Sequence, residues 1–150
     1  MSDLFLSRLQ LSDFRVYGDH YTFDLDPRPG VTLIAGANGL GKTTMFDGIE
    51  WALTGRVGRF DEMPLDGRRK ERNPLTRLGR PEGAHRVSLQ FSEGQPIDRG
   101  QGFEPTKADI VALLRRPDWP EIGDLGRYLS ITHFLGQAAS QRFSVRSPRA

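Results

Sequence analysis

The chain has 150 residues, of which 37% are hydrophobic and 27% charged, a composition typical of a globular domain and unlike that of a disordered chain. Its formal net charge is only +2, its three histidines are scattered and it has no cysteine, which excludes disulfides and thiolate metal sites and disfavours a histidine-rich zinc site. No apolar run approaches the roughly 18 residues of a membrane span, and the N-terminus lacks the pattern of a signal peptide, so we expect a cytoplasmic protein.

The first third of the sequence is patterned like β-strands. Apolar residues recur through 4–11, they alternate with polar residues through 21–25, and 16–19 has the composition of a turn. These segments predict an antiparallel hairpin. A second turn leads into the apolar run 31–35, which is bounded by glycines and is typical of a buried strand.

After residue 42 the period of the pattern changes to that of a helix. Apolar residues at spacings of three and four predict a helix over 42–54, and Gly55 is placed to end it. Residues 55–86 are rich in glycine, proline and charge and are predicted to be mostly loop. Nine basic residues against five acidic ones give 56–86 a net charge of +4, which fits either a contact with a phosphate backbone or a solvated arginine-rich loop.

The remaining elements are predicted from shorter patterns. Clean alternation predicts a strand over 86–91, glycine and proline predict a loop over 93–105, and apolar spacing predicts a helix over 107–115. Apolar and β-branched residues favour a strand over 128–135, and a helix over 124–129 is the alternative.

The chemistry is concentrated in residues 36–43, the P-loop, which match the phosphate-binding pattern G-x-x-x-x-G-K-[ST]. Glycines let successive backbone N–H groups converge on one anion, and the helix that follows points its positive end at the same place. Lys42 supplies a cation for the β- and γ-phosphates, and the Thr43 hydroxyl is a suitable ligand for Mg²⁺. We therefore predict that the chain binds a nucleotide with Mg²⁺; the P-loop alone does not choose among kinases, GTPases, helicases and ATPases, and ATP is what the resemblance described next implies. The predicted nucleotide-binding residues of this segment are Gly36, Asn38, Gly39, Gly41, Lys42, Thr43 and Thr44, with Lys42 as the catalytic one.

The segments around this loop resemble a known family. LQLSDFR at 9–15, YTFDL at 21–25, VTLIAGANG at 31–39 and FDGIEWALTG at 46–55 are similar to the N-terminal lobe of the ABC-type ATPase heads of SMC proteins, SbcC-type repair ATPases and RecF, with SbcC-like proteins the most similar. The resemblance implies an α/β P-loop NTPase. Its fold would be an antiparallel hairpin plus a strand–P-loop–helix unit on a mixed sheet, incomplete without a C-terminal lobe.

The resemblance also implies roles for residues outside the P-loop. Gln137 follows an apolar segment as the glutamine of the family's Q-loop does, and it would complete the Mg²⁺ shell with Thr43. Arg15 corresponds to an arginine near the α-phosphate and base, although it also fits a surface charge of the hairpin. Asn38 would position the loop and face the nucleotide edge of a partner subunit, and it equally suits a turn stabilised by its own side chain.

Four other residues have weaker assignments. Arg68 and Arg69, in the basic loop 56–86, are candidates for contacts with DNA or with the partner. Asp47 is expected to satisfy local donors or a dimer contact rather than to act as a base, and Trp51 is expected in the core.

Several parts of a complete head of this family are missing from residues 1–150. The sequence has no S-G-G signature, no apolar Walker B strand before Asp-Glu and no heptads of a coiled coil, so we expect an N-terminal lobe that binds ATP but does not hydrolyse it usefully alone. The implied partners are its own C-terminal lobe, a second ATPase head, DNA and a nuclease subunit, with a function in DNA repair or chromosome maintenance through ATP-driven head dimerisation. The alternatives are another P-loop NTPase, such as a small-molecule kinase or an anti-phage defence ATPase, and a non-hydrolysing nucleotide-binding module.

Overall fold

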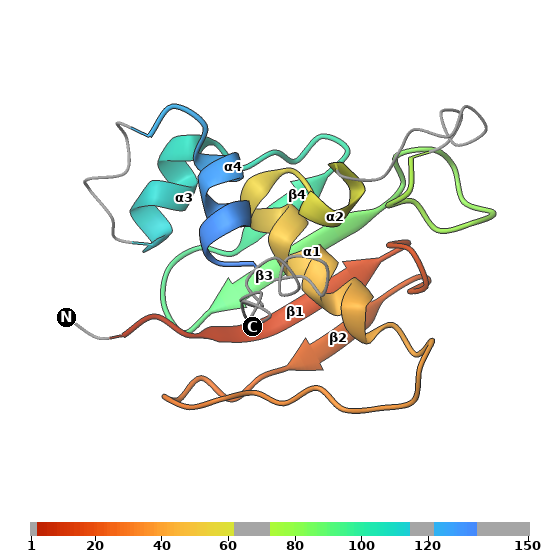
Figure 1. Ribbon diagram of the computed structural model, residues 1–150, viewed down its shortest axis with the longest axis horizontal. Helices are drawn as coiled ribbons and strands as arrows, with labels where there is room; N and C mark the ends of the chain where they lie inside the picture. The colour runs from red at the N-terminus through yellow and green to blue at the C-terminus, as the bar shows by residue number, and fades with distance from the viewer. Residues whose placement is uncertain (1–2, 62–72, 115–121, 135–150) are drawn as a thin grey trace, which may run out of the picture.

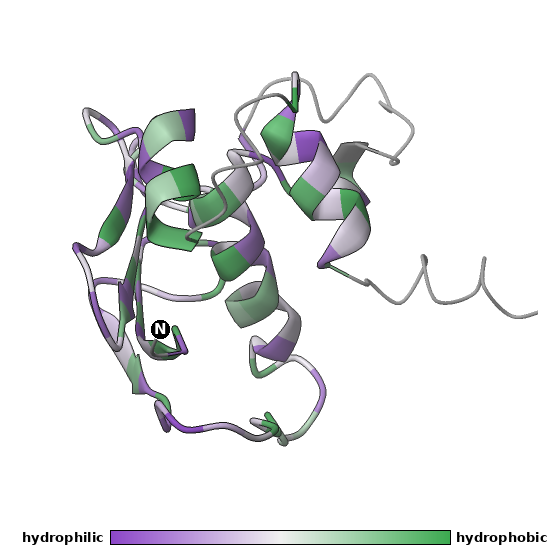
Figure 2. Ribbon diagram, turned by 90° about the vertical axis from the view of Figure 1, so that its left-hand side faces the viewer, coloured by the Kyte–Doolittle hydropathy of each residue, from purple (hydrophilic) through white to green (hydrophobic). Residues whose placement is uncertain are grey.

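The structure, a computed structural model, describes residues 3–61, 73–114 and 122–134. Its sheet has four strands in the order β2-β1-β3-β4, and every neighbouring pair is antiparallel. The strands are β1 (Leu6–Ser12), β2 (Tyr21–Asp24), β3 (Arg86–Phe91) and β4 (Ile97–Gly100). The helices are α1 (Lys42–Thr54), α2 (Gly58–Asp61), α3 (Lys107–Leu114) and α4 (Leu125–Thr132). The helices lie on one face of the sheet (Figures 1 and 2).

The predicted N-terminal hairpin is confirmed, and its alternation explains which face is covered. Leu9 and Leu11 of β1 are fully buried under the helices, while Arg8 and Gln10, which alternate with them, are exposed on the other face. The exposed face is held by polar cross-strand pairs, such as the one between Arg8 Nε and Asp24 Oδ1 at 2.6 Å. The period-2 pattern of the sequence is therefore the division between core and solvent.

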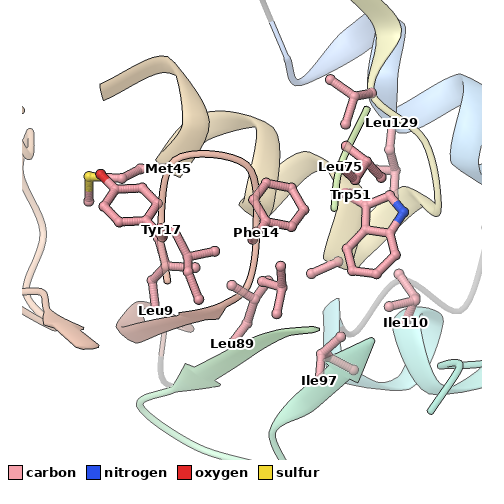
Figure 3. Packing of buried hydrophobic residues seen from close by; sticks show 14 of the residues in the cluster. Leu9, Phe14, Tyr17, Met45, Trp51, Leu75, Leu89, Ile97, Ile110 and Leu129 are labelled. Atoms are coloured by element: carbon pink, nitrogen blue, oxygen red, sulfur yellow. The ribbon is translucent and has the colours of Figure 1, made fainter. Parts of the chain in front are cut away.

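Helix α1 is the element that joins the core to the P-loop. It ends where predicted, because Gly55 has φ 75° and its N–H donates to Trp51 O at 2.8 Å. The helix lies so close to β1 that a Cβ on Gly48 would come within 2.7 Å of Leu11 Cδ2. Trp51 is in the core as expected, within the cluster drawn in Figure 3. The buried apolar residues of this cluster are Leu9, Leu11, Phe14, Tyr17, Met45, Trp51, Ala52, Val57, Leu75, Val87, Leu89, Ile97, Ile110, Leu125 and Leu129.

The strand predicted over 31–35 is wrong. These residues form no strand and are exposed, with Val31 at 96% and Leu33 at 85% of their maximal accessibility. They belong to the connection from β2 to α1, which runs outside the sheet (Figure 1). An apolar run becomes a buried strand only when neighbouring strands satisfy its N–H and C=O groups, and the four strands of the described residues pair only among themselves. The described sheet is consequently antiparallel throughout rather than mixed.

The C-terminal third also differs from the favoured expectation. The strand over 128–135 is wrong, and the alternative helix is correct: α4 spans Leu125–Thr132. Its start is capped by the Asp124 side chain, which accepts from Arg127 N at 2.9 Å, and two leucines four residues apart, Leu125 and Leu129, face the core. The loop predicted over 93–105 contains β4, which the sequence did not reveal. The strand at 86–91 and the helix from 107 are confirmed, and the loop after α1 contains the short helix α2.

Candidate phosphate-binding site

The P-loop lies at the N-terminus of α1 and is open to solvent. Residues 36–40 are all exposed, and the chain turns at Asn38 and Gly39 before the helix begins at Lys42. Gly39 and Gly41 have φ of 86° and 88°, in the left-handed region that favours glycine. This is the glycine-dependent curl that the sequence pattern predicted.

The first turn of α1 leaves its N–H groups available to an anion. Gly41 precedes the helix without a side-chain cap, and the first turn contains no acidic residue. Uncapped N–H groups and the helix dipole together favour a negative ligand at this end. A phosphate chain would therefore meet donors and no carboxylate here.

The Lys42 ammonium lies over the loop itself. Its Nζ donates to Gly36 O at 2.6 Å and to Ala37 O at 2.7 Å. These carbonyls neutralise none of its charge, so a phosphate placed inside the curl would compete for the ammonium with a stronger, charge-assisted interaction. The lysine is thus within the loop that would receive the phosphates.

The two threonines after Lys42 face different surroundings. Thr43 is exposed at the start of the helix, where its hydroxyl can reach a cation bound to phosphate oxygens. Thr44 is buried, so its contribution to a phosphate contact would come from its backbone N–H. In the part of the chain that the structure describes, no cluster of three His, Cys, Asp or Glu side chains offers an alternative metal site.

Tyr17 is a neighbour of the loop that the sequence did not single out. Its hydroxyl donates to Gly41 O at 3.2 Å and lies 3.5 Å from Leu40 O. A Cβ on Gly41 would come within 2.7 Å of the Tyr17 oxygen and 2.8 Å of Val16 Cγ2. The hairpin turn between β1 and β2 is therefore seated against the end of the P-loop. The only signal in the sequence is an aromatic residue inside the predicted turn 16–19.

Arg15 is engaged with groups beside α1 and α2. Its Nε lies 3.7 Å from Asp47 Oδ2, its Nη1 donates to Pro74 O at 3.3 Å and its guanidinium lies over the Phe60 ring. Burial lowers the pKa of Arg15, the neighbouring Arg59 lowers it further, and Asp47 opposes both. Contact of Arg15 with a nucleotide stays a prediction.

Asp47 is the centre of this charged cluster and is only 1% exposed. Its Oδ1 accepts from Arg59 Nε at 2.7 Å, and Oδ2 accepts from Arg59 Nη2. The expectation that Asp47 satisfies local donors is therefore confirmed. The pair fixes α2 against α1, one helical turn beyond Thr43.

The basic loop and the Q-loop are only partly covered by the structure. Gln137, Arg68 and Arg69 lie outside the described residues, so their predicted roles remain predictions. The arginines that are described in 56–86 are engaged within the chain. Arg59 binds Asp47, Arg77 donates to Val16 O, Arg80 binds Asp13 and Asp19, and Arg86 binds Asp98.

Comparison with known proteins agrees with this arrangement. The AAA domain family matches residues 8–111. The DNA replication and repair protein RecF of Paenarthrobacter aurescens is 41% identical over 117 residues, covering 75% of this chain and 28% of that protein. RecF of Rhizobium meliloti is 38% identical over 112 residues (75% and 27%), and RecF of Desulfitobacterium hafniense is 46% identical over 58 residues (37% and 15%). The chain thus spans between about 15% and 28% of the length of these curated relatives.

A solved structure shares the fold. It was reported under the heading "Structural biochemistry of ATP-driven dimerization and DNA stimulated activation of SMC ATPases", and it aligns with a TM-score of 0.57 at 20% identity over 96% of this chain and 93% of that one. The resemblance to SMC- and RecF-type heads and the α/β fold class are confirmed.

None of the helices in the described residues has the length and apolarity to cross a membrane.

Proposed function

The chain belongs to the AAA domain family, and on this premise we propose that it is the ATP-binding N-terminal lobe of an ATPase head acting in DNA repair or chromosome maintenance. The observation that carries the proposal is the open P-loop at the uncapped start of α1, with Lys42 folded onto its carbonyls. A glycine-rich turn with no ligand would not need a lysine within it. The name of the RecF relatives, DNA replication and repair protein, supports the biological setting, and a DNA-directed function fits a cytoplasmic protein.

The residues have distinct roles in nucleotide binding. The backbone N–H groups from Gly39 to Thr44 hold the β- and γ-phosphates, while Lys42 exchanges its two carbonyl partners for phosphate oxygens. Thr43 and Gln137 would hold Mg²⁺, which when bound would neutralise charge on the phosphates. Arg15 reaches the nucleotide only by leaving Asp47, which makes its contact dependent on the charged cluster beside α1.

The same reasoning gives the lobe its first partner. Val31 and Leu33 before the P-loop and Leu40 within it expose large apolar side chains. We assign them to an interface with the C-terminal lobe of the head, whose strands would pair with 31–35 and turn the antiparallel sheet into a mixed one. That lobe would supply the carboxylate that positions water, so residues 1–150 bind ATP without hydrolysing it usefully alone.

The remaining partners follow from the proposed head. ATP would be enclosed between two heads, as the ATP-driven dimerisation named for the SMC structure suggests, and DNA would stimulate the assembled protein. Arg68 and Arg69 are the proposed DNA contacts, since the described arginines of 56–86 already have partners in the chain. A nuclease subunit would join the complete protein if it acts in the manner of SbcC-like repair ATPases.

Nucleotide binding by the chain alone tests the proposal. We expect saturable binding of a fluorescent ATP analogue that weakens at least about tenfold in Lys42→Ala, because a charge-assisted bond to phosphate is lost. The control is Lys107→Ala, which removes the same charge from α3. Equal affinity of wild type and Lys42→Ala would overturn the proposal. Turnover by residues 1–150 that Lys42→Ala abolishes would overturn the need for the second lobe.

A further inference from the structure

We propose that Tyr17 is a positioning residue of the phosphate-binding loop, holding the Leu40–Gly41 turn in the shape that directs the first N–H groups of α1 at the phosphates. The inference rests on the proposed nucleotide-binding function. It concerns how the loop keeps its shape when no phosphate is bound to it.

The contact lies where the loop becomes the helix. Gly41 O accepts the first hydrogen bond of α1, from Met45 N at 3.0 Å, and it also accepts from the Tyr17 hydroxyl at 3.2 Å. A phenol has one O–H to donate, so the shorter contact, to Gly41 O rather than to Leu40 O, is the principal hydrogen bond. Tyr17 therefore fixes the peptide plane whose other side leads directly into the N–H of Lys42.

The Tyr17 ring is itself held firmly by the body of the protein. It is 7% exposed and belongs to the hydrophobic cluster, at the end where Met45 also lies (Figure 3). Its centroid is 5.1 Å from that of Tyr21 and 5.5 Å from that of Phe23, and Tyr17 N donates to Phe14 O at 3.0 Å. Burial raises the pKa of the phenol and so does Tyr21, so the hydroxyl stays a donor at neutral pH.

The rest of the loop has little such support. Residues 36–40 are exposed, and the other side-chain hydrogen bonds described for the loop come from its own Lys42. Those bonds must break when Lys42 turns to a phosphate, whereas the Tyr17 bond is directed at a carbonyl and can remain. Holding the turn before binding reduces the ordering cost that a phosphate ligand must otherwise offset.

The test compares Tyr17→Phe with Tyr21→Phe, which removes a hydroxyl from the neighbouring ring. In the chain without nucleotide, Tyr17→Phe should speed amide hydrogen exchange at Met45, because the carbonyl that accepts from it loses its second restraint. In binding experiments, Tyr17→Phe should weaken the affinities for ATP and for inorganic tripolyphosphate by the same factor of about fivefold, which corresponds to the loss of one hydrogen bond. Tyr21→Phe should leave the exchange and both affinities unchanged.

The outcomes separate this inference from the proposed function. Wild-type affinities in Tyr17→Phe, or loss of affinity for ATP but not for tripolyphosphate, would overturn the positioning role while nucleotide binding stands. If the wild type binds neither ligand, the proposed function fails, and Met45 exchange equal in Tyr17→Phe and Tyr21→Phe would then overturn the contact with the turn as well. A merely structural role of the Tyr17 hydroxyl would lower the unfolding free energy of Tyr17→Phe and would not move the tripolyphosphate affinity.

Discussion

Helix α1 and the connection that leads into it are neighbours in the sequence but are held in opposite ways. From Met45 onward the helix buries one side against β1 and β3, with Gly48 in close approach to Leu11. From Val31 to Leu40 every residue is exposed, although the segment contains as many large apolar side chains as a core strand. The comparison shows that hydrophobicity alone does not place a segment in a core: it also needs a partner for its backbone.

The difference in burial between the loop and the helix suits phosphate binding. A loop that wraps around phosphates needs backbone N–H groups that are not hydrogen-bonded elsewhere in the protein, and an exposed segment can offer them. A helix that carries the loop must not move, and burial supplies that rigidity. The boundary between the two regions lies at Gly41, where Tyr17 and Val16 touch the chain.

The largest predicted effect is the difference in stability between a leucine-to-alanine substitution in the packed region and the same substitution in the exposed connection. Leu89→Ala in β3 removes a side chain that is 0% exposed (Figure 3), and it should lower the free energy of unfolding by about 3 kcal/mol, since a buried leucine loses its transfer energy and leaves a cavity. Leu33→Ala should change it by less than about 0.5 kcal/mol. Urea unfolding of both variants measures this. A comparable decrease in the free energy of unfolding for Leu33→Ala would mean that 31–35 is packed in solution, and the contrast between the two regions would be wrong.

The packed region was largely predictable from the sequence. Alternation placed β1, β2 and β3, and the three-and-four spacing placed α1 to its last turn, because each of these elements buries one regular face. The P-loop was found from its own residues, since its shape depends on local glycines and one lysine. Patterns with a local physical cause were therefore the reliable ones.

The errors arose where distant contacts decide the structure. The sequence of β4 is IDRG, which contains one apolar residue. It forms a strand because β3 pairs with it along its length. In α4 the β-branched end of the segment favoured a strand, but the capping Asp124 and two buried leucines outweigh it. In 31–35 the composition was right for a strand and the pairing partner was missing.

The site shows the same limit. Tyr17 and Gly41 are 24 residues apart, and Asp47 and Arg59 are 12 apart on different helices. No spacing pattern in the sequence predicts either contact. Only the fold brings the hairpin turn to the P-loop and Arg15 to Asp47, so the support of the site had to be read from the structure.

A smaller effect should come from the charged cluster that fixes α2 against α1. Asp47→Asn should lower the free energy of unfolding by about 2 kcal/mol, because it leaves Arg59 and Arg15 without their buried carboxylate while some solvent still reaches both guanidiniums. The control is Asp26→Asn, which breaks an exposed pair with Arg28 in the connection outside the core. It should produce no measurable change. Equal effects of the two variants would show that the buried pair is not an anchor.

The smallest effect is a pH dependence that belongs to the packed region alone. His85 is buried against Phe14 and Trp51, and its Nδ1 lies 2.8 Å from Thr76 Oγ1, which itself accepts from Gly83 N. The Thr76 hydroxyl and Nδ1 share one hydrogen bond, and which of the two donates depends on the tautomer of the ring. Burial lowers the pKa of His85 and Glu82 opposes this only in part.

This shift fixes the sign of the effect. Above the unfolded-state value of about 6.5 the imidazole is neutral in both states, so His85 adds no pH dependence. As the pH falls below that value the unfolded chain takes up the proton first, and the free energy of unfolding decreases until the pH passes the lower folded-state pKa. Urea titrations between about pH 7 and pH 5 should show the decrease in wild type and in His20→Gln, and a flatter profile in His85→Gln. Residues 30–41 contain no titratable side chain. The affinity for tripolyphosphate should therefore have the same pH profile in wild type and in His85→Gln. A profile unchanged by His85→Gln would assign the acid sensitivity to other groups.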